Sequence, residues 1–198
     1  MSTHEYGRSA VRCALAAAAC AMLAACGQTA GTSAPKPGDQ QARVERGKYL
    51  VTIVGCNDCH TTKKMGPNGP EPDTTMLLAG HPEQMKMPAP PQLPPNGPWG
   101  LVVSPTLTAW SGPWGVSFSA NLTPDRNTGL GNWTEDMFVK ALRTGKHMGV
   151  SRQILPPMPW QEFAQMSDDD LRSIYAYLRT IPPVVNHVPD PIPPAAGG

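Results

Sequence analysis

The segment Cys56-Asn57-Asp58-Cys59-His60 sets the tightest limits on the chemistry of this 198-residue chain. Its CxxCH spacing is the attachment signature for c-type haem. Two thiols three positions apart at a helix end can reach both vinyl groups on one edge of a porphyrin, and the histidine that follows points its imidazole at the iron. The segment therefore predicts one covalently bound haem c, attached through Cys56 and Cys59, with His60 as an axial iron ligand.

The first 25 residues have the pattern of a bacterial export signal. Arg8 and Arg12 precede an alanine-rich apolar run that is too short to span a bilayer. Small residues before Cys26 resemble the lipobox of bacterial lipoproteins, which implies a lipid on Cys26; an ordinary cleaved signal that happens to hold a cysteine is the alternative. We expect a signal peptide over 1–25 and a flexible tether over 26–40, which is rich in Gly, Ser, Thr and Pro. The protein would then lie on the periplasmic side, anchored to the cell membrane or the outer membrane.

Three other uses of a CxxC pair compete with haem attachment. A thioredoxin-like redox pair usually needs a strand–helix–strand context, which this sequence lacks. A zinc site needs further ligands, and the chain has neither a second CxxC nor an HxxxH pair. The third use is a structural disulfide between Cys56 and Cys59. The export signal favours haem, because haem c is attached outside the cytoplasm.

Charge and cysteine content narrow the partners. Removing residues 1–25 takes two of the 16 basic and one of the 15 acidic residues, which leaves 14 of each. A neutral domain predicts neither a nucleic-acid partner nor strong electrostatic steering. Cys13 and Cys20 leave with the signal and Cys26 takes the lipid, so haem attachment leaves no thiol for a disulfide.

Apolar periodicity and capping residues predict a mainly α fold. A first helix is expected from about Gln41 to Val54, with Gly47 allowing close approach of another helix. A second is expected over 135–144, capped by Thr134 and ended by Gly145. A third follows the cap Ser167 and is stopped by two prolines at 182–183.

The segment 61–118 is a long proline-rich insertion in this pattern. It holds 12 of the 24 prolines, together with β-capable pieces at 101–103, 106–110 and 116–118. Loops of this length are functional or disordered. We expect a cytochrome domain over 41–183 with the insertion ordered in part and packed on its core, followed by an extended tail over 184–198. The chain has no internal repeat, so one haem is expected.

The sixth iron ligand is predicted to be Met158. Methionine is a frequent second axial ligand in electron-transfer haems. Prolines at 156, 157 and 159 stiffen the backbone on both sides of Met158 and hold its thioether in place. Most methionines fill gaps in a core, which is the alternative for Met158. The other candidate ligands are Met148, His147, His81 and His187.

The chain resembles class I c-type cytochromes, especially the haem modules of membrane-bound periplasmic dehydrogenase cytochrome subunits. Beside CxxCH, the resemblance is carried by Arg46-Gly47-Lys48-Tyr49-Leu50, Asn121-Leu122-Thr123-Pro124-Asp125 continuing to Gly145, and Pro157-Met158-Pro159-Trp160 continuing to Leu178. It implies that the first and last helices cross near-perpendicularly, with Gly47 facing Tyr175 or Tyr177. It also implies that His60 and Met158 lie on opposite haem faces, with Asn121 and Trp160 close by. Such subunits often carry two or three modules, whereas this chain has one and a longer insertion.

The function expected from these features is transfer of single electrons, without catalysis, between redox proteins such as a dehydrogenase and a terminal oxidase. The protein would be a free carrier or the electron-accepting subunit of a dehydrogenase complex. A haem enzyme or sensor with an open or displaceable sixth site is the main alternative, and a structural lipoprotein without haem is another. The tryptophans at 99, 110, 114 and 160 are expected to be packing residues.

Overall fold

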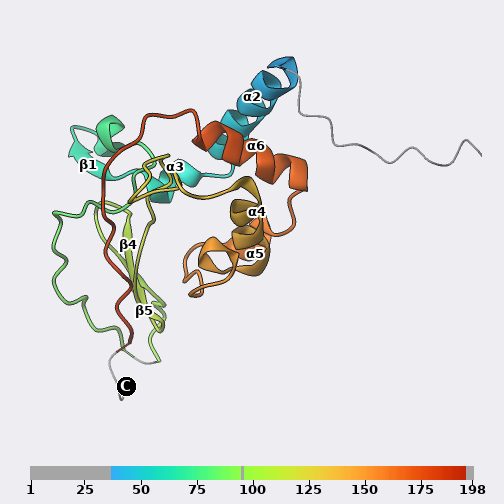
Figure 1. Cartoon of the computed structure of the whole chain (residues 1–198). Helices are drawn as coiled ribbons and strands as arrows, with labels where there is room; N and C mark the ends of the chain where they lie inside the picture. The colour runs from blue at the N-terminus through green and yellow to red at the C-terminus, as the bar shows by residue number, and fades with distance from the viewer. Residues whose placement is uncertain (1–36, 95, 195–198) are drawn as a thin grey trace, which may run out of the picture. The chain divides into compact units, whose positions relative to one another are not determined.

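A computed structural model describes residues 37–94 and 96–194 (Figure 1). The expected signal peptide, the lipid-bearing Cys26 and most of the tether lie outside these residues. The helices are α2 Pro37–Ile53, α3 Cys56–His60, α4 Glu135–Thr144, α5 Trp160–Phe163 and α6 Asp168–Leu178. None of the helices in the described ranges is long and apolar enough to cross a bilayer.

Helix α2 begins four residues earlier than the sequence predicts. Its first residue is Pro37, so residues 37–40 are helical and do not belong to the tether. Proline suits the first helical position, because its fixed φ matches the helix and its missing N–H would have no partner there. Asp39 in the first turn adds a charge that favours the positive helix end. These local signals outweigh the low apolar content of the segment.

Helices α4 and α6 confirm the capping predictions. The Thr134 hydroxyl accepts a hydrogen bond from the Met137 amide at 3.2 Å, and Gly145 closes α4 in the left-handed region at φ 64°. The Ser167 hydroxyl accepts from the Asp170 amide at 3.1 Å at the start of α6. Each cap satisfies an amide that the first helical turn leaves without an intrahelical partner.

Helices α2 and α6 cross in close contact at Gly47. A Cβ at this position would overlap the Ser173 carbonyl and lie 2.8 Å from the Cβ of Tyr177. Only a residue without a side chain lets the two backbones approach this closely. The expected placement of Gly47 against Tyr177 is therefore confirmed.

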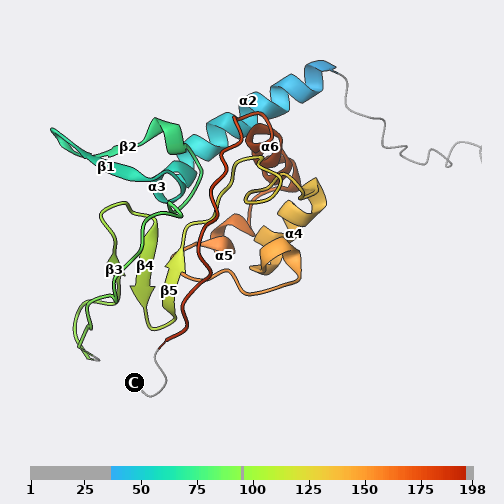
Figure 2. The same cartoon turned by 60° about the vertical axis from the view of Figure 1, so that its left-hand side comes forward.

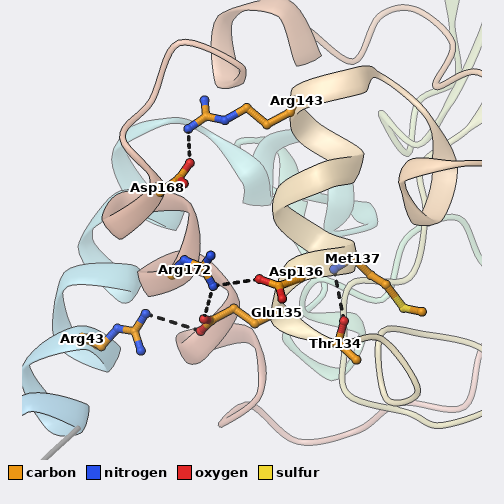
Figure 3. A network of polar contacts seen from close by, with 8 residues as sticks. All are labelled: Arg43, Thr134, Glu135, Asp136, Met137, Arg143, Asp168 and Arg172. Carbon is orange, nitrogen blue, oxygen red and sulfur yellow. Dashed lines mark hydrogen bonds and ion pairs between the residues drawn. The ribbon is translucent and has the colours of Figure 1, made fainter. Parts of the chain in front are cut away.

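The helices enclose an apolar core. Its buried members are Leu50, Val51, Leu78, Leu130, Phe138, Val139, Leu142, Leu171, Ile174, Leu178 and Ile181. Ion pairs cross the rim of this core and join three helices (Figure 3). Glu135 of α4 accepts from Arg43 of α2 at 3.4 Å and from Arg172 of α6 at 2.6 Å, and Arg143 of α4 pairs with Asp168 of α6.

Two small antiparallel sheets lie on the side of the domain away from α4 and α6 (Figure 2). The first joins β1 Lys63–Gly66 to β2 Gly69–Pro72, and the second has the order β3 Val102–Val103, β4 Ala109–Gly112 and β5 Gly115–Phe118. The second sheet falls on the β-capable pieces of the sequence. The sequence did not predict the β1–β2 hairpin, whose register pairs Gly66 with Gly69 and leaves Pro67 and Asn68, two common turn residues, at its tip.

The tail after Pro183 is extended and packed on the domain. It runs beside the second sheet in both views (Figures 1 and 2). Ile192 exchanges two backbone hydrogen bonds with Val116 of β5, at 2.8 and 2.9 Å. Asn186 is almost completely buried, at 1% exposure. The tail is therefore a part of the fold rather than an appendage to it.

Candidate haem-binding site

The CxxCH segment leaves α2 through a sharp turn at Gly55. This glycine has φ 74°, which favours a residue without a Cβ, and it starts the single turn of α3. Cys56 and Cys59 therefore project from α3 three positions apart. Cys56 packs against the apolar core, and Cys59 is partly exposed.

The two cysteines carry free thiols rather than a disulfide. Burial raises the pKa of the Cys56 thiol to about 11, and burial also raises the pKa of Cys59. Reactive redox cysteines have a lowered pKa, because the thiolate is the attacking species. The environment of Cys56 and Cys59 is thus the opposite of a thioredoxin-like site.

His60 is buried and its ring is fixed. Its Nδ1–H donates to the carbonyl oxygen of Ala120 at 2.8 Å. A carbonyl can only accept, so the proton sits on Nδ1 and the lone pair sits on Nε2. Burial lowers the pKa of His60, which keeps the imidazole neutral near pH 7. A neutral imidazole, oriented by a carbonyl on its other nitrogen, is the usual form of a metal-binding histidine.

The start of the proline-rich insertion folds back onto this histidine. The Gly80 amide donates to the His60 carbonyl at 2.8 Å, and the Leu78 amide donates to the Thr61 hydroxyl at 2.9 Å. A Cβ at Gly80 would overlap the Ser119 carbonyl, so the chain passes here at backbone contact distance. Residues 78–81 therefore brace the segment that carries His60.

Met158 lies at the border of the same core. Its side chain is partly buried against the core cluster that Cys56 also contacts. A cleft of about 650 Å³ lies beside it, lined by Gln153, Ile154 and residues 156–162. The Met158 and CxxCH segments thus share one core, but neither the two cysteines nor His60 lines that cleft. Trp160 packs against Gly145, where a Cβ would meet its ring.

The other candidates for the sixth iron ligand differ from one another in burial and in contacts. His81 is fully buried with both ring nitrogens engaged, Nδ1 with the Thr108 hydroxyl at 2.9 Å and Nε2 with the Met85 carbonyl at 3.3 Å. His81 therefore has no nitrogen left for iron. His147 packs edge-on against Trp133, Met148 follows it at φ 55°, and His187 is exposed on the tail.

The tryptophans include one buried donor without an acceptor. Nε1 of Trp110, on β4, has no hydrogen-bond partner within the described part of the chain. Its cross-strand neighbour Ser117 donates to the Pro156 carbonyl at 2.6 Å, close to Met158 in sequence. Trp114 donates to Ser117 at 3.2 Å, whereas Trp99 is 73% exposed and does not pack as expected.

These groups suit haem c. Two thiols on one helical turn, an imidazole with its lone pair on Nε2 and a methionine thioether are the donors that a c-type haem uses.

Sequence reasoning missed one contributor to this site, the backbone of Ala120. Ala120 acts through its backbone carbonyl, which leaves no side-chain signature. Its only signal is its place directly before the family-like segment that starts at Asn121.

The chain was compared with known proteins. No family model matches it. It is 31% identical over 153 residues to the cytochrome c subunit of alcohol dehydrogenase (quinone) from Gluconobacter oxydans. The aligned residues make up 76% of this chain and 24% of that protein. It is 28% identical over 160 residues to the fructose dehydrogenase cytochrome subunit of Gluconobacter japonicus, 80% of this chain and 26% of that protein.

A third relative is the gluconate 2-dehydrogenase cytochrome c subunit of Pantoea cypripedii, 31% identical over 136 residues, 69% of this chain and 22% of that protein. The matched region spans about a quarter of the length of these curated relatives. Over most of its own length, this chain resembles the cytochrome c subunits of dehydrogenases.

Proposed function

We propose that this protein is an electron-transfer cytochrome with a class I fold and one haem c. Cys56 and Cys59 would attach the haem by adding their S–H groups across its two vinyl groups. His60 and Met158 would be the axial ligands of the iron. The observation that carries the proposal is His60, buried directly after the two thiols, with Nδ1 fixed by Ala120 and the lone pair on Nε2.

The haem would supply a one-electron Fe(III)/Fe(II) couple. His60 holds its imidazole in one orientation, and the thioether of Met158 favours the reduced iron and a higher potential. With both axial positions filled, no substrate reaches the iron. The chain therefore accepts one electron from a donor and passes it to an acceptor without catalysing a reaction of its own.

The relatives suggest the kind of partner. All three are cytochrome subunits of dehydrogenases, so we propose a dehydrogenase as the electron donor, on the periplasmic side of the membrane. A lipid on Cys26 would hold the domain there, with the tether ending before Pro37. A terminal oxidase is the proposed final acceptor, directly or through another carrier.

The test is expression with export in a bacterial host that matures c-type cytochromes. Mass spectrometry should show the added mass of one haem, and the pyridine haemochrome should have the spectrum of two saturated vinyl groups. The double variant Cys56→Ala/Cys59→Ala should lose covalent haem. Absence of covalent haem in the wild-type protein would refute the proposal.

Ligation by Met158 needs its own variant and a matched control. Oxidised protein should show the weak band at the red end of the visible spectrum that marks methionine on Fe(III), and Met158→Ala should lose it. Met166→Ala is the control, because Met166 is also partly buried against the same core. A band that survives in Met158→Ala would move the sixth ligand to another residue. Tight CO binding by the wild-type ferrous protein would favour a displaceable sixth site.

A further inference from the structure

The C-terminal tail makes buried polar contacts that an apolar cover would not need. Val185 is 77% exposed and Ile192 is 51% exposed, and Val184 and Val188 are only partly buried. The side chain that is buried is Asn186, at 1% exposure. What the tail inserts into the domain is therefore a hydrogen-bonding group.

Asn186 holds the backbone that follows the CxxCH segment. Its Nδ2 donates to the carbonyls of Ala79 at 2.6 Å and His81 at 2.9 Å, and its Oδ1 accepts from the Glu83 amide at 2.9 Å. One side chain thus fixes three peptide groups that lie more than 100 positions away in sequence. Gly80, between the first two, donates to the His60 carbonyl.

The tail holds the second segment that touches His60 as well. Asn121 donates to the Val184 carbonyl at 2.9 Å, and its Oδ1 accepts from the Thr123 hydroxyl at 2.7 Å. That hydroxyl also accepts from the Val184 amide at 3.1 Å. Asn121 directly follows Ala120, whose carbonyl accepts from His60 Nδ1.

The two segments are joined to each other beside the histidine. The His81 amide donates to the Ser119 carbonyl at 2.9 Å, next to Ala120. The tail therefore forms hydrogen bonds with both segments that contact His60. It contacts residues 79–83 through Asn186 and residues 121–123 through Asn121 and Thr123. A shift of either segment would move the Ala120 carbonyl relative to the imidazole.

We propose that residues 184–186 act as a clamp that positions the Ala120 carbonyl and, through it, the His60 imidazole. Asn186 and Thr123 are positioning residues, since neither touches the ring of His60. This inference rests on the proposed function, in which His60 binds iron. A short, fixed Nδ1–H···O=C hydrogen bond makes the imidazole a more basic ligand and stabilises Fe(III). Loosening the clamp should therefore favour Fe(II).

The experiment uses the holoprotein and two nearly isosteric variants, Asn186→Leu and Thr123→Val. Both keep the buried volume and remove hydrogen bonds of the clamp. Mutation of a group that hydrogen-bonds a metal-bound histidine changes metal affinity or activity by about 10–100-fold. The clamp acts one hydrogen bond further from the metal, so its effect should be smaller. We expect a ~3–10-fold rise in the equilibrium constant for reduction by a mediator. Ferrous protein with ¹⁵N-labelled histidine should show faster solvent exchange of the His60 Nδ1 proton.

Two controls separate positioning from stability. Ile174→Val removes one methylene from the core in α6 and should lower the melting temperature without changing the reduction equilibrium. Asn132→Leu removes an exposed hydrogen bond to the Arg126 carbonyl and should change neither quantity. If the clamp variants melt earlier but keep the wild-type reduction equilibrium and Nδ1 exchange, the clamp proposal is wrong and the tail is only structural.

The pyridine haemochrome of each sample distinguishes a failure of the proposed haem attachment from a failure of the clamp proposal. Wild-type protein without covalent haem would overturn the proposed function and the clamp together. Covalent haem in every sample, with equal reduction equilibria, would overturn the clamp alone. If Asn186→Leu fails to fold, Thr123→Val carries the same test from the other end of the clamp.

Discussion

The helical part of this domain and the region from His60 to Thr123 are buried in different ways. In the helices, the buried side chains are almost all apolar. From 60 to 123 they are mostly histidines, hydroxyls and an amide, namely His60, Thr61, Thr62, His81, Ser104, Thr106, Thr108, Ser117, Ser119, Asn121 and Thr123. The helices are held by apolar burial, whereas the region around His60 is held by directed hydrogen bonds.

The difference matters for a site that must hold a ligand in one orientation. Apolar contacts are non-directional, so a helical core tolerates small shifts of its side chains. A buried hydroxyl network does not, because each displaced group leaves a partner unsatisfied. The polar region supplies the hydrogen bonds to His60, the residue whose orientation is proposed to set the iron chemistry. Rigid positioning and bulk stability are thus supplied by separate parts of the chain.

The largest expected effect comes from a deletion in the apolar part. Leu171→Ala removes a fully buried side chain from α6 and should lower the free energy of unfolding by about 2–5 kcal/mol, from lost transfer energy and the cavity left behind. Thr108→Val, a near-isosteric change in the polar part, should cost about 1–3 kcal/mol, because it leaves His81 Nδ1 without its partner and removes one of the two hydrogen bonds of the Thr106 hydroxyl. Denaturant unfolding of both variants measures the difference.

The two variants should rank in the reverse order in their effect on the iron environment. Thr108→Val lies in the network around His60, so it should change the oxidised absorption spectrum more than Leu171→Ala does. A larger spectral change in Leu171→Ala would show that the core, and not the polar network, sets the geometry at His60.

The next effect is a pH dependence that arises in the polar part. Burial lowers the pKa of His81, so below its ordinary pKa the unfolded chain binds a proton that the folded protein does not. Stability therefore falls as the pH falls from 7 to 5. His81→Gln removes this titration and should weaken the pH dependence without abolishing it, since burial also lowers the pKa of His60 and of His147; the change should be smaller than the loss in Leu171→Ala. Unfolding at pH 7, 6 and 5 in both proteins measures it.

Local protection shows where the acid acts. Hydrogen exchange at pH 5 should become faster at the His81 and Ser119 amides before it does in α4 and α6. Uniform loss of protection across the domain would contradict the assignment to His81, since His147 beside α4 also has a pKa lowered by burial.

The same contrast explains what could be predicted from the sequence. Helices α4 and α6 are predicted with their caps, because Thr134, Gly145 and Ser167 act within one turn of the helix they limit. The polar part is held by contacts such as that of Asn186 with Ala79, across 107 positions. No periodicity marks such pairs, so the sequence indicates the β-capable pieces of the insertion but not the contacts by which the insertion and the tail hold each other.

The candidate site also contains groups that the sequence pattern indicates and groups that it does not. Cys56, Cys59, His60 and Met158 were chosen from side-chain type and spacing, and those choices remain predictions. The groups that orient His60 are the carbonyl of Ala120, which any residue could supply, and the amide of Gly80, whose contact with the Ser119 carbonyl leaves no room for a Cβ. Sequence patterns find the donors of a site more readily than the carbonyls and amides that aim them.

The smallest effect comes from the ion pairs at the rim of the helical part (Figure 3). Glu135→Gln weakens the contacts with Arg43 and Arg172, whose side chains are about a quarter to a third exposed. Exposed pairs contribute about 0.2–1 kcal/mol, and most of this should vanish at 1 M salt, where the screening length falls to about 3 Å. The cost of Thr108→Val, which involves no charge, should be the same at low and high salt. Denaturant unfolding of the two variants at both salt concentrations checks this, and a cost of Glu135→Gln that persists in 1 M salt would mean that hydrogen bonding rather than charge joins α4 to its neighbours.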